Sequence, residues 1–263
     1  MKKNVIKIFL FTAFLYLPLS GFSWGKLGHR IVGQIADSYL SKQAKREIYK
    51  ILGTESIAMT SNWPDFIKSD PSYSYLDNWH YINFKPGLSE TELKNYLAND
   101  TATDAYSKIN WLVVQLKNKG LEQQNKLMYL RLLIHIVGDI HQPLHTGRPE
   151  DRGGNGIRLT WFNNPYNLHQ VWDDRLIDLQ ELSYTEYATA INHTTKEQRM
   201  QWQAEPLSEW IWQSYQLAEK IYADVKQDDK LGYLYNFKNI GTVNQQLLKG
   251  GVHLAGLLNE IFG

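Results

Sequence analysis

The stretch NKLMYLRLLIHIVGDI, residues 125–140, is almost wholly apolar from Leu127 to Val137. An apolar run of this length predicts a helix that lies inside the protein rather than on its surface. Near its end stand His135 and Asp139, which are four residues apart and therefore share one face of the helix. The sequence thus predicts a central helix that carries a His–Asp pair of the kind that binds metal ions.

Helical spacing of apolar residues extends over most of the remaining chain. Ile31, Ile35 and Tyr39 predict a helix over residues 26–52, with Gly53 as its stop. The same pattern predicts helices over residues 103–116, 184–191, 208–225 and 233–261. No repeat and no linker composition divides the chain. We therefore predict a single, mainly α (all-α) domain.

Two short segments depart from the helical pattern. The run Gly153-Gly154-Asn155-Gly156 predicts a turn, and residues 157–162 beside it favour a short hairpin. Residues 79–84 alternate in polarity, which predicts a short extended segment with His80 and Ile82 on one side and Tyr81 and Asn83 on the other.

Further side chains of the metal-ligating type surround the central pair. A second pair with the same spacing is His169 and Asp173, and single candidates are Asp65, His80 and His145. Histidine nitrogen and carboxylate oxygen bind zinc at about 2.0 to 2.2 Å, so these groups could hold more than one ion if they converge. One His or Asp alone is usually a hydrogen-bonded structural residue. Two pairs at this spacing favour a metal site.

Three histidines are left out of this set. His141 lies between Asp139 and His145, where the helix is expected to end near Gln142-Pro143. His193 and His253 are interpreted as ordinary surface or packing residues.

The first 23 residues are typical of a secretory signal peptide. Lys2 and Lys3 precede an apolar stretch at residues 8–17, and the small residues Gly21 and Ser23 stand three and one positions before Trp24. Cleavage there would leave residues 24–263 as the mature domain, exported to the periplasm or outside the cell. It would also create a free α-amine on Trp24, near His29, which could bind a metal ion through nitrogen.

Composition limits the partners and the source of stability. The chain contains no cysteine, so an exported form has no disulfide and depends on its core. Removal of Lys2, Lys3 and Lys7 with the signal leaves 25 basic residues against 27 acidic ones, a net charge of −2. Such a chain has no overall basic field for a long nucleic-acid duplex. Any polyanion must be held locally, by metal ions and a few side chains.

Taken together, the candidate ligands resemble those of the zinc-dependent single-strand-specific nucleases of fungi, plants and bacteria, over essentially the whole mature chain. The resemblance implies a mostly helical fold with three Zn²⁺ ions at the bottom of a cleft. It implies hydrolysis of single-stranded DNA and RNA to 5′-mononucleotides, accompanied by 3′-nucleotidase activity. The implied ligands are Asp65, His80, His135 and Asp139 for the first ion, His145, His169 and Asp173 for the second, and Trp24, His29 and Asp139 for the third.

The resemblance also implies roles around the metal ions. Asp65 would orient the attacking water, and Asp139 would bridge the pair of zinc ions that activates it. Lys68 would neutralise the negative charge that develops on the phosphate. An exposed lysine is as often a plain surface residue. Tyr81 stands where the family has a stacking aromatic residue, and Asn155 where it has a polar contact to the base. Asn83 departs from the pattern, because relatives often carry Asp there. Since Asn both donates and accepts, base preference is expected to differ.

Two rival functions remain open from the sequence. The fold is shared with bacterial zinc phospholipase C, whose substrate is also a phosphodiester, but whose last ligand pair typically ends in Glu rather than Asp173. An exported zinc-binding protein without catalysis would instead close each coordination sphere, which a shared Asp139 does not allow. The tryptophans Trp111, Trp202, Trp210 and Trp212 lie in helical stretches and are interpreted as core residues.

Overall fold

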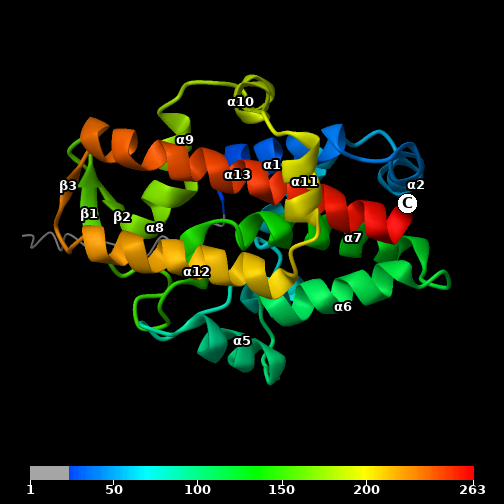
Figure 1. Ribbon diagram of the computed structural model, residues 1–263, viewed down its shortest axis with the longest axis horizontal. Helices are drawn as coiled ribbons and strands as arrows, with labels where there is room; N and C mark the ends of the chain where they lie inside the picture. The colour runs from blue at the N-terminus through cyan, green and yellow to red at the C-terminus, as the bar shows by residue number, and fades with distance from the viewer. Residues whose placement is uncertain (1–23) are drawn as a thin grey trace, which may run out of the picture.

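The computed structural model describes residues 24–263, so the predicted signal peptide lies outside the described residues. The fold is mainly α, as predicted (Figure 1). In chain order the helices are α1 (Lys26–Ser38), α2 (Lys42–Leu52), α3 (Ile57–Thr60), α4 (Trp63–Ile67), the 3₁₀ segment η1 (Pro71–His80), α5 (Glu90–Ala98), α6 (Ala105–Lys117), α7 (Gln123–Asp139), the 3₁₀ segment η2 (Pro143–Thr146), α8 (Leu168–Gln170), the π-helical segment η3 (Val171–Arg175), α9 (Leu176–Asp178), α10 (Tyr184–Ile191), α11 (Lys196–Gln203), α12 (Leu207–Asp224) and α13 (Tyr233–Phe262).

Helix α7 is the central element that its apolar sequence predicts. Every residue from Leu132 to Asp139 is buried. The helix packs against α1, α4, α6 and α13, so neighbours surround it. In Figure 1, α12 and α13 run along the long axis of the molecule and α7 passes behind them. Burial on all sides explains why the segment shows no polar face.

The prediction of one helix over residues 26–52 is wrong, because the structure divides it into α1 and α2. The side chain of Asn259 in α13 accepts a hydrogen bond from the Ser41 N–H at 2.8 Å and donates one to the Tyr39 carbonyl at 3.0 Å. The Ser41 hydroxyl then accepts from the Ala44 N–H and caps α2. A contact from 220 residues away thus satisfies the backbone where the helix breaks.

A small sheet stands beside the helices. Its strands are β1 (Arg158–Trp161), β2 (Asn164–Asn167) and β3 (Lys230–Leu231), in the order β2-β1-β3. The predicted hairpin is the antiparallel pair β1–β2, which turns at Phe162 and Asn163, both with positive φ as a two-residue hairpin turn requires. The parallel partner β3 was not predicted, since two residues carry no pattern.

Residues 81–84 follow η1 as an extended segment rather than as a strand of the sheet. Their N–H groups pair with the chain after η2, because the Ile82 N–H donates to the His145 carbonyl at 2.9 Å and that of Phe84 donates to the Gly147 carbonyl at 3.0 Å. His80 and Ile82 are buried, whereas Tyr81 is exposed. The predicted alternation is therefore present.

Helices α3, α4, α5 and α11 were not predicted, and one tryptophan that was expected in the core is partly exposed. Helix α5 starts with a Ser89–Glu92 capping box and α11 with Thr195, but neither has a long apolar face. Trp202 and Trp210 are buried as predicted, whereas the side chain of Trp111 is 36% exposed.

Among residues 24–263, no helix is apolar enough over sufficient length to cross a membrane.

Candidate metal centre

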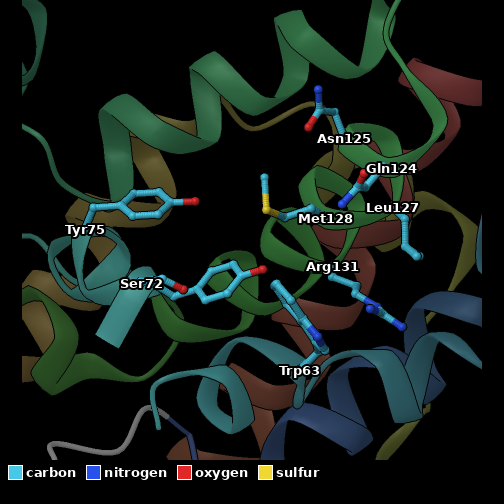
Figure 2. Close-up of a pocket in the computed structure, with 9 residues that line it drawn as sticks. Trp63, Ser72, Tyr75, Gln124, Asn125, Leu127, Met128 and Arg131 are labelled. Carbon is cyan, nitrogen blue, oxygen red and sulfur yellow. The ribbon is translucent and has the colours of Figure 1, made fainter. Parts of the chain in front are cut away.

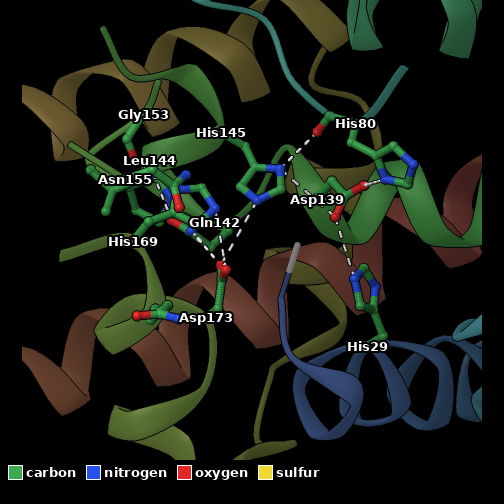
Figure 3. Close-up of polar contacts among 12 residues, drawn as sticks. His29, His80, Asp139, Gln142, Leu144, His145, Gly153, Asn155, His169 and Asp173 are labelled. Carbon is green, nitrogen blue, oxygen red and sulfur yellow. Dashed lines mark hydrogen bonds and ion pairs between the residues drawn. The ribbon is translucent and has the colours of Figure 1, made fainter. Parts of the chain in front are cut away.

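Six segments bring the predicted ligand side chains together in the interior. Helix α7 supplies His135 and Asp139, η2 supplies His145, and the continuous helix made by α8 and η3 supplies His169 and Asp173. The other three come from shorter elements: His29 from the first turn of α1, Asp65 from the middle of α4 and His80 from the end of η1. The histidines and the two later aspartates are buried, and the Asp65 side chain is 6% exposed. Figure 3 shows most of these groups around Asp139 and Asp173.

Asp139 lies at the middle of the first group. Its Oδ2 lies 2.9 Å from Nδ1 of His80 and 3.2 Å from Nε2 of His135. Its Oδ1 lies 3.3 Å from Nε2 of His29, whose ring stacks on that of His135 with centroids 3.9 Å apart. Nε2 of His135 is also 3.7 Å from Oδ1 of Asp65. One carboxylate therefore faces donors on both sides, as a bridging ligand would.

Asp173 organises the second group in a similar way. Its Oδ2 lies 3.2 Å from Nε2 of His169, and its Oδ1 lies 3.8 Å from Nε2 of His145. The two imidazole rings are stacked with centroids 5.0 Å apart. Gln142 donates from Nε2 to Oδ1 of Asp173 at 2.6 Å, which fixes the carboxylate plane. The side chains of His145, His169 and Asp173 thus point to one place (Figure 3).

Main-chain carbonyls orient three of the histidines. Nδ1 of His135 is 2.7 Å from the Ser61 carbonyl oxygen, and Nδ1 of His145 is 2.7 Å from that of His80. Nδ1 of His169 is 2.6 Å from the carbonyl oxygen of Gly153. A histidine that donates Nδ1–H to a carbonyl holds its lone pair on Nε2, which is the usual support for a metal-binding imidazole. In all three, Nε2 faces a buried carboxylate.

The glycine turn predicted at residues 153–156 is what places one of these carbonyls. Gly153 and Gly154 have φ of 65° and 83°, a region that side chains disfavour. A Cβ at Gly153 would also collide with the Leu144 carbonyl oxygen. The close approach of this turn to η2 therefore requires glycine, and it brings the Gly153 carbonyl against His169.

Burial and contacts between the ligand side chains shift their pKa values. Burial lowers the pKa of His80 to about 4 and that of His145 to about 3, and it raises the pKa of Asp173 to about 7. Burial would also raise the pKa of Asp139, but His135 and the other histidines outweigh it and hold that pKa well below its usual value. Neutral His80 and His145 beside an ionised Asp139 are the protonation states that a metal ion needs. The pKa of His135 moves the other way: burial lowers it, but the carboxylates of Asp139 and Asp65 outweigh burial and raise it.

Two further observations indicate that these side chains could hold metal ions. Several buried atoms have no hydrogen-bond partner among the described residues, namely Nε2 of His29, His80 and His145, Oδ1 of Asp139 and Oδ2 of Asp173. Buried polar atoms are normally paired, so this concentration needs an occupant. Ligands at about 2.0 to 2.2 Å from a tetrahedral ion lie roughly 3.3 to 3.6 Å apart. The donor atoms of three groups lie within 4.8 Å of one another: His29, Asp65 and His135; His80, His135 and Asp139; His145, His169 and Asp173.

Trp24, the predicted first residue of the mature chain, is fully buried. The N–H of Gly25 donates to the Asp173 carbonyl at 2.9 Å, which ties the start of α1 to the second ligand group. A Cβ at Gly25 would collide with the carboxylate of Asp174. The chain before α1 is therefore pressed against η3, close to the ligands.

The remaining predicted residues belong to segments next to the ligands: Lys68 follows α4, Tyr81 and Asn83 follow His80, and Asn155 lies in the glycine turn. Nζ of Lys68 is 2.7 Å from Oδ1 of Asp65, and the lysine side chain is 21% exposed. The Tyr81 ring is 36% exposed, and its hydroxyl donates to Oδ1 of Asn78. Asn83 is half-buried. Asn155 donates from its amide to the Arg152 carbonyl at 2.9 Å, so its side chain also braces the glycine turn.

Some functional contacts were not predicted from the sequence. Gln142 was read only as a helix end, yet its amide joins Asp173 to the Leu144 N–H. Its position just before Pro143, between two ligand residues, is the signal that could have identified it. His141, which was left out of the predicted ligand set, instead pairs with His253 at 2.7 Å, and the His253 ring stacks on Trp210.

Comparisons with known proteins identify the family of the chain. The family model described as S1/P1 Nuclease matches residues 24–263. Endonuclease 3 of Arabidopsis thaliana is 30% identical over 91% of this chain and 89% of its own length. Nuclease P1 of Penicillium citrinum is 28% identical over 91% of this chain and 98% of its own length, and Nuclease S1 of Aspergillus oryzae is 32% identical over 62% and 58%. Because the family model covers every described residue, the chain belongs to the S1/P1 nuclease family.

Proposed function

We propose that this chain is an exported, zinc-dependent endonuclease that hydrolyses single-stranded DNA and RNA to 5′-mononucleotides and also acts as a 3′-nucleotidase. The observation that carries the proposal is the buried donor set around Asp139 and Asp173, in which three imidazoles are aimed by main-chain carbonyls. The names of the relatives, which are nucleases and endonucleases, support the same class of reaction.

Three Zn²⁺ ions would be held by nine residues. In this proposal Asp65, His80, His135 and Asp139 hold the first, His145, His169 and Asp173 the second, and Trp24, His29 and the shared Asp139 the third. The two oxygens of Asp139 face different histidines, which suits a bridging role. When bound, zinc ions supply an activated water near neutral pH and neutralise charge on the phosphate and leaving oxygens.

The protein side of the reaction falls to Asp65, Asp139 and Lys68. The Asp65 carboxylate accepts from Lys68 with one oxygen, and this places an ammonium group at the edge of the buried cluster. A partly exposed Lys68 offers its remaining N–H donors to a phosphate oxygen. Such a preorganised cation stabilises the charge that builds up on the pentacoordinate phosphate. Asp65 and Asp139 would orient the attacking water.

Substrate bases would meet the rim of the cluster. The exposed ring of Tyr81 offers a surface on which a base can stack, and its bond to Asn78 restrains the ring. Asn83 and Asn155 supply amide groups that both donate and accept hydrogen bonds. These contacts read an unpaired base, which supports a preference for single strands.

The decisive experiment compares substrates with the zinc-loaded, exported protein. We expect it to release acid-soluble 5′-nucleotides from single-stranded DNA and from RNA, to lose this activity to a chelator, and to regain it with zinc. Phosphatidylcholine vesicles serve as the control for a lipid phosphodiesterase. Lipid hydrolysis with intact nucleic acid would overturn the proposal. N-terminal sequencing of the exported protein checks the predicted start at Trp24.

A further inference from the structure

A cavity of about 470 Å³ lies outside the ligand cluster, and no predicted metal ligand lines it. It is formed between α4, η1 and the first half of α7 (Figure 2). Aromatic rings form one side, from Trp63, Tyr73 and Tyr75, and the amides of Gln124 and Asn125 stand on another. Figure 2 shows Met128 between Tyr75 and the two amides, with Arg131 and Trp63 side by side in this view. Its volume suits a ligand the size of a nucleotide.

The rings of this wall belong to a longer series of aromatic contacts. Ring centroids are 5.8 Å apart for Trp63 and Tyr73, 6.3 Å for Tyr73 and Tyr75, and 6.0 Å for Tyr75 and Trp79. The series continues from Trp79 to Trp111 on α6 at 5.9 Å. The ring of Tyr75 is 54% exposed, although it sits among other aromatic residues. An exposed ring on such a platform is available for stacking.

Two cations lie over rings of the same series. The guanidinium of Arg131 is 5.3 Å from the Trp63 ring centroid. Nζ of Lys108 is 4.7 Å from the Trp79 ring and 5.5 Å from the Trp111 ring. Glu55 pairs with Arg131 at 2.6 Å, so the guanidinium charge is largely balanced. Stacking rather than charge would therefore dominate binding here.

Two helices, α4 and α7, contribute side chains both to the cavity and to the metal centre. Trp63 is two residues before Asp65 on α4, so the two side chains leave the helix on different sides. Arg131 is one turn before His135 on α7, a rise of about 6 Å. A nucleic-acid strand whose phosphate lies at the metal centre would reach the cavity with a base further along the strand.

We propose that this cavity, together with the exposed ring of Tyr75, binds a nucleobase of a single-stranded nucleic acid at a position beyond the scissile phosphate. The proposal rests on the proposed nuclease function. Base stacking on aromatic rings tolerates every sequence, because each base has a flat face. Bases inside a duplex are already stacked on one another and do not reach the cavity. The site therefore contributes both affinity for long substrates and discrimination against duplexes.

Binding is measured first, with the protein kept in a chelator, by fluorescence anisotropy of a labelled oligothymidylate. Tyr75→Ala should weaken binding by about five-fold or more, as expected for the loss of one stacking contact. Tyr75→Phe keeps the ring and should bind within about two-fold of the parent. The matched control is Tyr233→Ala, since Tyr233 is also an exposed tyrosine, 75% exposed, but at the start of α13. It should bind like the parent.

Kinetics of the zinc-loaded protein give a second readout. Tyr75→Ala should raise KM for the oligonucleotide and leave kcat/KM for a dinucleoside monophosphate unchanged, because the shorter substrate does not reach the cavity. Equal binding by Tyr75→Ala and the parent would overturn the inference, whether or not the protein is a nuclease. Tyr75-dependent binding without any hydrolysis would support the cavity and overturn the proposed function instead.

Discussion

Nε2 of His29 lies 3.3 Å from Oδ1 of Asp139, although the two residues belong to helices α1 and α7. The other oxygen of Asp139 faces His80 and His135. One carboxylate therefore serves two groups of donors, and the two groups are expected to depend on each other.

Replacement of Asp139 by Asn tests this dependence. An amide has one oxygen acceptor and no negative charge, so the variant should lose more than one zinc ion per chain and have no measurable nuclease activity. Metal content measured by inductively coupled plasma mass spectrometry checks the prediction. Full activity with three bound zinc ions would contradict it.

An extra residue before Trp24 should weaken the third metal site. The α-amine would move away from His29, while the chain from Gly25 onward stays tied to Asp173 by its hydrogen bond. We expect one zinc ion fewer per chain and lower turnover, compared with protein that starts at Trp24. Equal metal content and equal turnover in both forms would rule out the N-terminus as a ligand.

Gly153→Ala should damage the second ligand group. The substitution forces a side chain into positive φ and into the Leu144 carbonyl, which displaces the carbonyl that orients His169. We expect a loss of more than about 2 kcal/mol in the free energy of unfolding, together with weaker zinc binding. Gly53→Ala is the matched control, because Gly53 also has positive φ but open space around it. It should cost about 1 to 3 kcal/mol, because φ of 67° with ψ of −118° is a sparsely populated conformation, and it should leave zinc binding intact.

Lys68→Gln should lower kcat/KM by about 100-fold without removing metal, because it deletes a cation next to the proposed phosphate site. The control is Lys45→Gln, since Lys45 forms a similar ion pair with Asp37 at 2.6 Å on the surface. Activity close to that of the parent in Lys68→Gln would identify Lys68 as a plain surface residue.

In the metal-free protein, Asp173 should destabilise the fold as pH rises. Burial raises its pKa to about 7 from 3.8, so the folded state binds a proton more tightly than the unfolded state. The free energy of unfolding that protonated Asp173 contributes is fully present below about pH 4. It is lost as pH rises from there to about 7, at about 1.4 kcal/mol per pH unit. Asp173→Asn should therefore be more stable than the parent at pH 8, in urea unfolding with a chelator, and the gain should shrink toward pH 5.

A surface carboxylate supplies the control for this measurement. Hydrogen bonds from Ser72 lower the pKa of Asp70, which is the opposite direction. Asp70→Asn should give no gain at pH 8. A gain of the same size in both variants would show that net charge, rather than the burial of Asp173, controls stability.

The sequence predicted the parts of the fold that have their own local pattern. Helices α7, α10, α12 and α13 lie within two residues of their expected bounds, because each is long or strongly periodic. At the missed break between α1 and α2, Asn259 satisfies the free backbone groups from the other end of the chain, a contact that no local pattern reveals. Strand β3 was missed because its two residues pair only after the chain has folded.

Only some parts of the candidate site could likewise be predicted from the sequence. Side-chain type and spacing identified seven of the eight side chains that the structure brings together, and the predicted cleavage before Trp24 pointed to the eighth, His29. Their ligation of zinc stays a prediction. The carbonyls of Ser61, His80 and Gly153 were not identified, because a main-chain group leaves no mark in a sequence. Nor was the aromatic cavity, whose rings meet only through the path of η1 against α4 and α7.

The carbonyl groups that aim the three imidazoles have an evolutionary consequence. Every residue carries a carbonyl, so a change of the Ser61 side chain leaves the support of His135 in place. The orientation of the imidazole depends on the path of the main chain rather than on which side chain the neighbouring residue carries. Surrounding positions are then free to drift while the chemistry persists. The orientation of these imidazoles thus tolerates side-chain substitutions at Ser61, whose main-chain carbonyl would remain in place.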